Sequence, residues 1–367
     1  MAKEMQPGLF GLSKENSNRD FTKPATWGKN QFNTSFPVAL ACYMHAKRID
    51  PVYLELNEHL EISRKRISFR EVFGIEPLSE ELYFSFESPF LPYEKFVVDK
   101  LPRIDLVTMK KSIKGIRYLR PCEIKLTALP DNSTANFSED KYGCEIVVRP
   151  DSILYLALSI SKLYLNQREE LRIYLEEICG RKDINWSEER DVRQLLPDLV
   201  SALDEALKAK LDYQSPFMMQ PIWKTEGKAL RLSENCFDIF IWSDFAFTRL
   251  FVDEIHRWTP EKKINRPMRT VVWLSKMLYN FSVTGKINYE EIIDTYTYGT
   301  KNDKAFAVSG RITNKYMICP ELITPRVRRD ELRNIILGGG EKFLSPERRL
   351  DATILSMPEL FEHVSSA

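Results

Sequence analysis

The chain has 367 residues, of which 43% are hydrophobic and 29% are charged. Lys and Arg number 53 and Asp and Glu number 52, so the formal net charge is +1. These values exclude a disordered, collagen-like or coiled-coil protein and a histone-like polycation, although a balanced total can hide a locally basic face. The length allows one large domain or two ordinary ones.

Cysteine and histidine patterns argue against the common metal and redox sites. The six cysteines include no Cys-x-x-Cys pair, and the four histidines form no ligand-spaced pair. We therefore expect no zinc ribbon, thioredoxin-like site or histidine metal site. The start lacks the apolar core of a signal peptide, and no apolar stretch approaches the ~20 residues of a membrane span. We expect a cytoplasmic protein that does not enter a membrane.

The first 150 residues predict an arm, a helix and then a sheet. Residues 1–36 are expected to form an irregular N-terminal arm. Ser35 and Pro37 mark the start of a helix that runs to about Arg48, since both residue types favour a first turn. Alternating aliphatic and aromatic residues then predict strands at Val52–Leu56, Leu82–Phe86, Phe96–Val98, Ile104–Val107, Tyr118–Thr127 and Glu145–Val148.

From residue 151 the pattern becomes mainly helical. One helix is expected over Ser152–Leu165 and a second after Ser187, where leucines four residues apart form a packing stripe: Leu195, Leu199, Leu203, Leu207 and Leu211. Later elements are strands at Ala229–Leu232 and Phe237–Trp242 and helices at Phe245–His256 and Met268–Phe281. The chain from 295 onward is less regular and more basic.

These elements predict an α+β protein in which helices flank a central mixed sheet. We expect a core over 37–260 with a helical insertion at about 151–215. A C-terminal helical and basic region is expected over 261–367.

One group of residues has the pattern of a catalytic site. Asp105 lies in the apolar run Ile104–Val107, and Glu123-Ile124-Lys125 follows 18 residues later. The link 108–117 contains Gly115 and predicts a hairpin. Because side chains alternate along a strand, Glu123 and Lys125 fall on one face, and ordinary hairpin register brings Asp105 to them near one end of the sheet.

The chemistry of this group suits phosphodiester cleavage. Two neighbouring carboxylates require a cation between them, and oxygen ligands select a hard ion such as Mg²⁺. A lysine beside them can orient the attacking water, while the metal stabilises charge on the leaving oxygen. Glu-x-Lys also occurs by chance as an exposed charge pair. Two features favour the catalytic interpretation over a chance charge pair. Asp105 lies in an apolar strand, where an unpaired carboxylate is costly. The segment 103–125 has a net charge of +5, which suits a polyanionic substrate.

The Asp105 and Glu123-Ile124-Lys125 pattern resembles the active site of the PD-(D/E)xK nuclease superfamily, with the usual proline displaced to Pro102. Over most of its length the chain resembles the HindVP-type family of type II restriction endonucleases, in the segments Asn18–Phe21, Thr26–Asn33 and Cys144–Asp151. The resemblance implies a restriction-endonuclease-like α/β core and a homodimer that makes Mg²⁺-dependent double-strand cuts at a short palindrome similar to GRCGYC. A cognate DNA methyltransferase is the genetic partner it implies.

The site residues follow from this pattern. Asp105, Glu123 and Lys125 are expected to be catalytic, Asp105, Glu123 and Ile124 to hold the metal, and Glu145 and Glu71 are candidates for a further acidic residue. Basic and amide side chains near the arm, the hairpin and the C-terminal region are expected to contact double-stranded DNA: Lys29, Asn30, Gln31, Asn33, Lys110, Lys111, Lys114, Lys301, Lys304, Arg311, Asn314 and Lys315. Arg311 and Asn314 are the candidates for base readout. At the level of domains, we expect the arm over 1–36 to contact DNA, the core over 37–260 to be catalytic, and the region over 261–367 to contribute DNA recognition and dimer contacts.

Two other functions remain open at this point. One is a nuclease of the same fold that serves repair or phage processing. The other is a non-enzymatic DNA-binding protein in which the acidic and basic cluster is structural.

Overall fold

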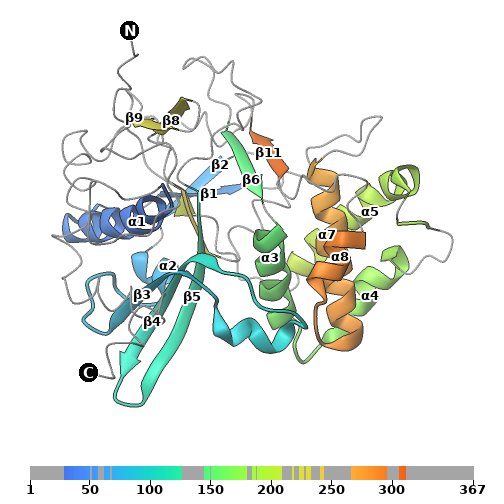
Figure 1. Ribbon diagram of the computed structural model, residues 1–367, viewed down its shortest axis with the longest axis horizontal. Helices are drawn as coiled ribbons and strands as arrows, with labels where there is room; N and C mark the ends of the chain where they lie inside the picture. Colours follow the sequence, from blue (N-terminus) through green and yellow to red (C-terminus); the bar gives the residue numbers. More distant parts are fainter. Residues whose placement is uncertain are drawn as a thin grey trace, which may run out of the picture.

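The fold is α+β, with helices on both sides of an antiparallel sheet (Figure 1). The structure is a computed structural model, which describes 29–49, 52–56, 62–66, 68–125, 144–148, 150–179, 184–186, 188–208, 217–218, 223–226, 229–232, 240–243, 266–295 and 306–310. Among these residues, no helix is both long and apolar enough to cross a membrane.

The central sheet has seven strands in the order β2-β1-β7-β10-β5-β4-β3. Each pairing described within it is antiparallel, so the expectation of a mixed sheet is wrong for this part of the chain. The strands that were predicted near the site are present, and β5 is an interior strand between β4 and β10. The strands are β1 Val52–Leu56, β2 Ile62–Arg66, β3 Leu82–Ser88, β4 Ile104–Ser112, β5 Gly115–Lys125, β7 Phe217–Met218 and β10 Phe240–Ser243.

A group of helices covers one face of this sheet (Figure 1). Helix α7 packs against α3, α4 and α5, and it contributes Trp273 and Phe281 to the main core. Val107 and Met109 of β4 join the same core, which therefore lies between the sheet and the helices. The helices are α3 Pro150–Leu163, α4 Arg168–Cys179, α5 Glu189–Lys208, α7 Arg266–Thr284 and α8 Tyr289–Thr295.

The predicted leucine stripe packs in this core. Leu195, Leu199 and Leu203 of α5 are all buried, which confirms this part of the stripe. Spacing of four residues returns close to the same side of a helix with 3.6 residues per turn, so these side chains face the core together. The side chains of Leu207 and Leu211, and the helix expected over Phe245–His256, lie outside the described residues.

Two further helices lie against the opposite face of the sheet. Helix α1 (Lys29–Ala46) packs on β3 and β5, and the short helix α2 (Phe69–Phe73) packs on β5. On this face Phe73 contacts the ring of Phe84, with centroids 5.8 Å apart. Helix α1 begins at Lys29, earlier than the cap expected at Ser35. Ser35 and Pro37 therefore lie inside the helix and not at its start.

Short elements complete the described chain. A separate two-stranded sheet pairs β6 (Cys144–Val148) with β11 (Phe306–Gly310), and β8 (Trp223–Glu226) pairs with β9 (Ala229–Leu232). The strand expected at Phe96–Val98 is wrong, because Leu91–Phe96 forms a 3-10 helix with a proline in its first turn. Val97 retains only a single β-bridge, to Ile287.

Candidate active site

The β4–β5 hairpin carries the residues that the sequence predicts as catalytic. The two strands are antiparallel, and the pair nearest the predicted site is Leu106 with Cys122. One further step in this register brings Asp105 opposite Glu123. Opposite positions on antiparallel strands share a face of the sheet, and Lys125 follows two residues after Glu123 on that face. The backbone therefore brings the three positions to one end of two adjacent strands.

This end of the hairpin lies inside the sheet, not at its edge. Strand β10 pairs with β5 on the side away from β4, with Trp242 opposite Glu123 and Phe240 opposite Lys125. The backbone of the predicted site is therefore fixed by hydrogen-bonded neighbours on both sides of β5. A site built on paired strands holds its geometry better than one on a loop.

Asp105 is partly exposed in an otherwise buried strand. Its neighbours Ile104 and Leu106 are both buried, whereas Asp105 retains access to solvent. A carboxylate at this position can meet a ligand that approaches the sheet, while the strand around it remains packed.

The other predicted ligands are described only by their backbone. The side chains of Glu123, Ile124 and Lys125 lie outside the described part of the structure. Among the side chains that are described, no group of three or more His, Cys, Asp and Glu residues is arranged to hold a metal ion. Convergence of the Asp105, Glu123 and Lys125 side chains stays a prediction.

Helix α2 and the hairpin are joined by buried hydrogen bonds. The hydroxyl of Thr108 donates to the carbonyl oxygen of Phe73 at 2.7 Å and accepts from the amide of Arg120 at 3.2 Å. The second of these bonds spans the point where the β4–β5 register shifts. Cys122, immediately before Glu123, is also buried, with its Sγ 4.0 Å from the carbonyl oxygen of Val72.

Tyr155 connects α3 to the entrance of β4. Its hydroxyl accepts a hydrogen bond from the amide of Phe90 at 3.0 Å and donates to the carbonyl oxygen of Pro102 at 2.8 Å. Pro102 lies three residues before Asp105, so this buried hydroxyl fixes the segment that leads into the predicted site. A buried tyrosine hydroxyl requires a hydrogen-bond partner, but which groups serve it depends on the fold, so the sequence analysis missed this role.

We expect Tyr155→Phe to lower the free energy of unfolding by about 1–3 kcal/mol, because two buried backbone groups lose their partner. Chemical denaturation monitored by tryptophan fluorescence measures this change. Tyr83→Phe is the matched control, since the Tyr83 hydroxyl makes no hydrogen bond within the described chain, and its effect should be under ~0.5 kcal/mol. Equal effects of the two substitutions would contradict the bridging role of Tyr155.

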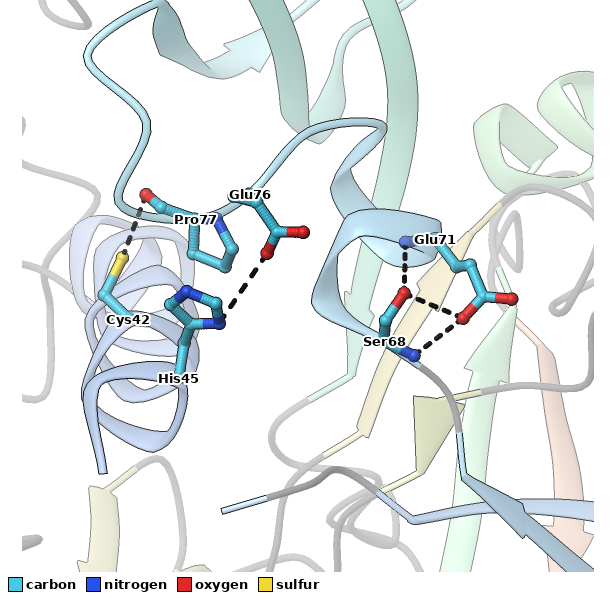
Figure 2. Close-up of polar contacts among 6 residues, drawn as sticks. All are labelled: Cys42, His45, Ser68, Glu71, Glu76 and Pro77. Carbon is cyan, nitrogen blue, oxygen red and sulfur yellow. Dashed lines mark hydrogen bonds and ion pairs between the residues drawn. The ribbon is translucent and has the colours of Figure 1, made fainter. Parts of the chain in front are cut away.

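Glu71, a candidate for a further acidic residue, takes part in a helix cap (Figure 2). Its carboxylate accepts hydrogen bonds from the backbone amide of Ser68 at 2.7 Å and from the Ser68 hydroxyl at 2.9 Å, while its own amide donates to that hydroxyl. This capping box begins α2, and Gly74 ends the helix at a φ of 82°. The cap accounts for the position of this carboxylate, and a role of Glu71 in the chemistry stays a prediction.

A second contact in Figure 2 fixes α1 to the same region. His45 lies 3.7 Å from the carboxylate of Glu76, and the thiol of Cys42 lies 3.7 Å from the carbonyl oxygen of Pro77. Helices α1 and α2 thus form one support behind the hairpin. Glu145, the other acidic candidate, lies opposite Ser309 in the β6–β11 sheet, and its side chain lies outside the described residues.

The residues predicted to contact DNA are spread over several elements. Lys29, Asn30, Gln31 and Asn33 lie in the first turns of α1, and their side chains are outside the described part. Lys110 forms an ion pair with Glu81 at 2.9 Å, and the Lys111 ammonium lies 5.3 Å from the centroid of the Tyr83 ring. Lys114 is exposed in the hairpin turn. The remaining predicted contacts lie outside the described residues: Lys301, Lys304, Arg311, Asn314 and Lys315.

The turn itself is shorter than predicted. Strand β4 continues to Ser112 and β5 begins at Gly115, so the link expected over 108–117 is reduced to Ile113 and Lys114. Gly115 has a φ of 112°, a backbone conformation that residues other than glycine rarely adopt. The hairpin prediction is confirmed, and the basic residues of the link lie mainly on paired strands.

Two tyrosines at the main core have pKa values above the usual range. Burial raises the pKa of Tyr118 on β5, and the nearby carboxylate of Glu94 adds to this shift. Burial, followed by the charges of Glu290 and Asp151, raises the pKa of Tyr289 to about 12. Both phenols therefore stay protonated at neutral pH.

The sequence matches a known family over nearly its whole length. The model of the HindVP restriction endonuclease family matches residues 27–361. The type II restriction enzyme HgiDI of Herpetosiphon aurantiacus is 46% identical over 359 residues, which cover 98% of each chain. The probable type II restriction enzyme HindVP of Haemophilus influenzae is 42% identical over 357 residues, covering 97% of this chain and 96% of that one.

No solved structure matches the chain significantly. The family match instead confirms the resemblance carried by the segments around residues 18–33 and 144–151. The chain belongs to the HindVP restriction endonuclease family, and with that family to the type II restriction enzymes.

Proposed function

We propose that this enzyme cuts both strands of duplex DNA at a short palindrome, with Mg²⁺ held by Asp105 and Glu123 and by the backbone around Ile124. The register of β4 and β5 is the observation that supports the proposal, because its continuation by one residue beyond the pair of Leu106 with Cys122 would align Asp105 with Glu123. The sheet with helices on both faces is compatible with a restriction-endonuclease-like core.

The donor set suits a hard divalent cation. Carboxylates directly opposite one another on paired strands repel, and a bound cation removes this cost. Oxygen-only ligands in small number are typical of Mg²⁺, which keeps several waters. When bound, Mg²⁺ supplies Lewis-acid stabilisation of the charge that develops on the scissile phosphate and on the leaving oxygen.

The protein groups perform the remaining tasks. Asp105 and Glu123 contribute negative charge and orientation, and Lys125 holds the attacking water and offsets negative charge on the phosphate. Tyr155 fixes the entrance of β4 and therefore the backbone position of Asp105. Further acidic help from Glu145 or Glu71 belongs to the same proposal.

DNA recognition involves α1 and the basic C-terminal region. Amide and basic side chains of Lys29–Asn33 and of 301–315 provide donors for bases and phosphates, with Arg311 and Asn314 as base readers. A palindrome is read most simply by a two-fold homodimer in which each subunit cuts one strand. The site we propose is GRCGYC, and a cognate DNA methyltransferase is the expected genetic partner.

Digestion of a plasmid of known sequence, followed by end mapping, tests this proposal. With Mg²⁺ we expect a discrete set of fragments whose ends map to GRCGYC sites, and with EDTA we expect intact plasmid. Degradation that begins at DNA ends would favour a repair or phage-processing nuclease. Binding without cleavage under all divalent ions would favour a DNA-binding protein and contradict the catalytic role of the hairpin.

A further inference from the structure

The far end of the β4–β5 hairpin extends beyond the rest of the sheet (Figure 1). The pairing of β3 with β4 ends at Leu82 and Lys110, whereas β4 and β5 continue through Lys111 with Ile116 and Ser112 with Gly115. Every residue from 111 to 117 is exposed. We call residues 111–117 the hairpin tip, a two-stranded ribbon without a covering layer in the described structure.

The hairpin tip carries an apolar side chain that the turn does not require. Ile113 occupies the first turn position and has 108% of its reference area exposed, and Ile116 is 48% exposed. Turns favour Gly, Asn, Asp, Ser and Pro, each for a conformational reason that Ile lacks. Since Gly115 already supplies the left-handed residue, Ile113 contributes nothing to the turn that a polar residue would not supply.

Positive charge surrounds this apolar point. From residue 106 to residue 122 the sequence contains five Lys and Arg residues and no Asp or Glu. Lys110 lies directly opposite Arg117, an arrangement of like charges that destabilises a strand pair. Lys110 is paired with Glu81, but Lys114 and Arg117 form no ion pair within the described chain. Cations kept together at a folding cost suit a polyanionic partner.

We propose that the hairpin tip enters the major groove of the substrate duplex, with Ile113 against base edges and with Lys114 and Arg117 on the flanking phosphates. The major groove of B-form DNA, about 12 Å wide, admits a two-stranded ribbon without deformation of the duplex, whereas the minor groove is only about 6 Å wide. An apolar side chain contacts the thymine methyl group in that groove, and the two cations match the phosphates beside it. This inference rests on duplex DNA being the substrate.

The position of the tip fixes where this contact falls. Ile113 lies eight residues from Asp105 along β4, which at about 3.3 Å per residue is roughly 26 Å. The same length of duplex holds about eight base pairs. The hairpin tip therefore contacts DNA that flanks the cleavage point, away from the phosphate that is cut.

Binding of a 40-base-pair duplex with one GRCGYC site, measured without divalent ions over a range of salt, tests the role of the tip. We expect Ile113→Asn, which places a turn-favouring residue in the turn and should leave the hairpin intact, to weaken binding about tenfold. The plot of log affinity against log salt has a negative slope. In the double variant K114Q/R117Q this slope should become less steep by about two, because two phosphate contacts are lost. Ile173→Asn on α4 and Lys286→Gln, both exposed and far along the chain, are the matched controls and should bind like the unmodified enzyme.

Methylation by dimethyl sulfate, which attacks guanine N7 in the major groove, locates the contact. We expect protection of guanines about eight base pairs from the cut in the unmodified enzyme and loss of this protection in Ile113→Asn. If tip variants bind and protect DNA like the unmodified enzyme, the inference is wrong while the proposed function stands. If Ile113→Asn instead lowers the molar mass in light scattering, the tip joins two copies of the chain and the DNA assignment is overturned. If the unmodified enzyme binds and cuts no duplex, the proposed function and this inference fail together.

Discussion

Replacement of any one of the three hairpin residues should lower the cleavage rate roughly a thousandfold or more while DNA binding is retained. Asp105→Asn, Glu123→Gln and Lys125→Met each remove one charge and keep nearly the same size. Loss of metal or phosphate stabilisation of several kcal/mol corresponds to a factor of this size. Single-turnover cleavage of a supercoiled plasmid measures the rate, and duplex binding in Ca²⁺ measures the retained affinity.

The matched controls for these variants are carboxylates on exposed surfaces away from the hairpin end. Asp294→Asn on α8 and Glu80→Gln before β3 make the same chemical change and should cut DNA at the unmodified rate. Glu71→Gln tests whether Glu71 acts in the chemistry or only in the helix cap, since glutamine preserves a capping box and removes only the charge. A cleavage rate within threefold of the unmodified enzyme for Asp105→Asn or Glu123→Gln would remove that residue from the proposed site.

Replacement of Trp273 by alanine should produce the largest loss of stability. Trp273 is 1% exposed and is among the largest fully buried side chains, on the helix that contacts α3, α4 and α5. Removal of a buried tryptophan costs about 3–5 kcal/mol, because the transfer energy is lost and a cavity remains. Thermal unfolding followed by circular dichroism should show the apparent melting temperature lowered by roughly 5–10 °C.

Val283→Ala on the same helix provides the comparison. Val283 is more than half exposed, so its truncation should change stability by less than ~0.5 kcal/mol. Similar losses for Trp273→Ala and Val283→Ala would show that α7 is not the centre of the core. Because the sheet face of β4 packs in this same core, we also expect cleavage by Trp273→Ala to be lost at a lower temperature than cleavage by the unmodified enzyme.

Local patterns predicted the hairpin well because they depend on neighbouring residues. Alternation identified the strands around Asp105 and Glu123, and Gly115 identified the turn region. The register needed the structure, because strand pairing depends on the turn length and on the shift between Thr108 and Met109. The candidate residues could therefore be identified from local sequence patterns, whereas their backbone alignment required the structure.

Features set by distant contacts were missed. Helix α4 was not predicted, because its sequence is rich in charged residues. Its buried contacts come from Leu171 and Leu175, which are too few to stand out as an apolar stripe. Its surface is held partly by Arg172, which pairs with Glu169 and Glu176. The antiparallel order of the sheet joins strands far apart in sequence, such as β5 with β10, and no local pattern encodes such a pairing.

Two functional features also escaped the sequence. Tyr155 lies in the apolar sequence of α3, and only the positions of Phe90 and Pro102 reveal its bridging role. In the sequence, Ile113 belongs to the basic link between two predicted strands. Only the structure shows that its side chain is exposed, in the part of the hairpin that continues past the last pair between β3 and β4. Both depend on which chain segments lie nearby, which composition and spacing do not determine.

Iron-directed cleavage of the polypeptide tests most directly whether the hairpin end holds the metal. Fe²⁺ replaces Mg²⁺ at oxygen-ligand sites, and with ascorbate and peroxide it produces hydroxyl radicals that break the backbone close to the bound ion. We predict cuts near residues 105 and 123, identified by fragment mass, that excess Mg²⁺ suppresses and that Asp105→Asn abolishes. Mg²⁺-sensitive cuts confined to other parts of the chain, with none near these two residues, would contradict the account.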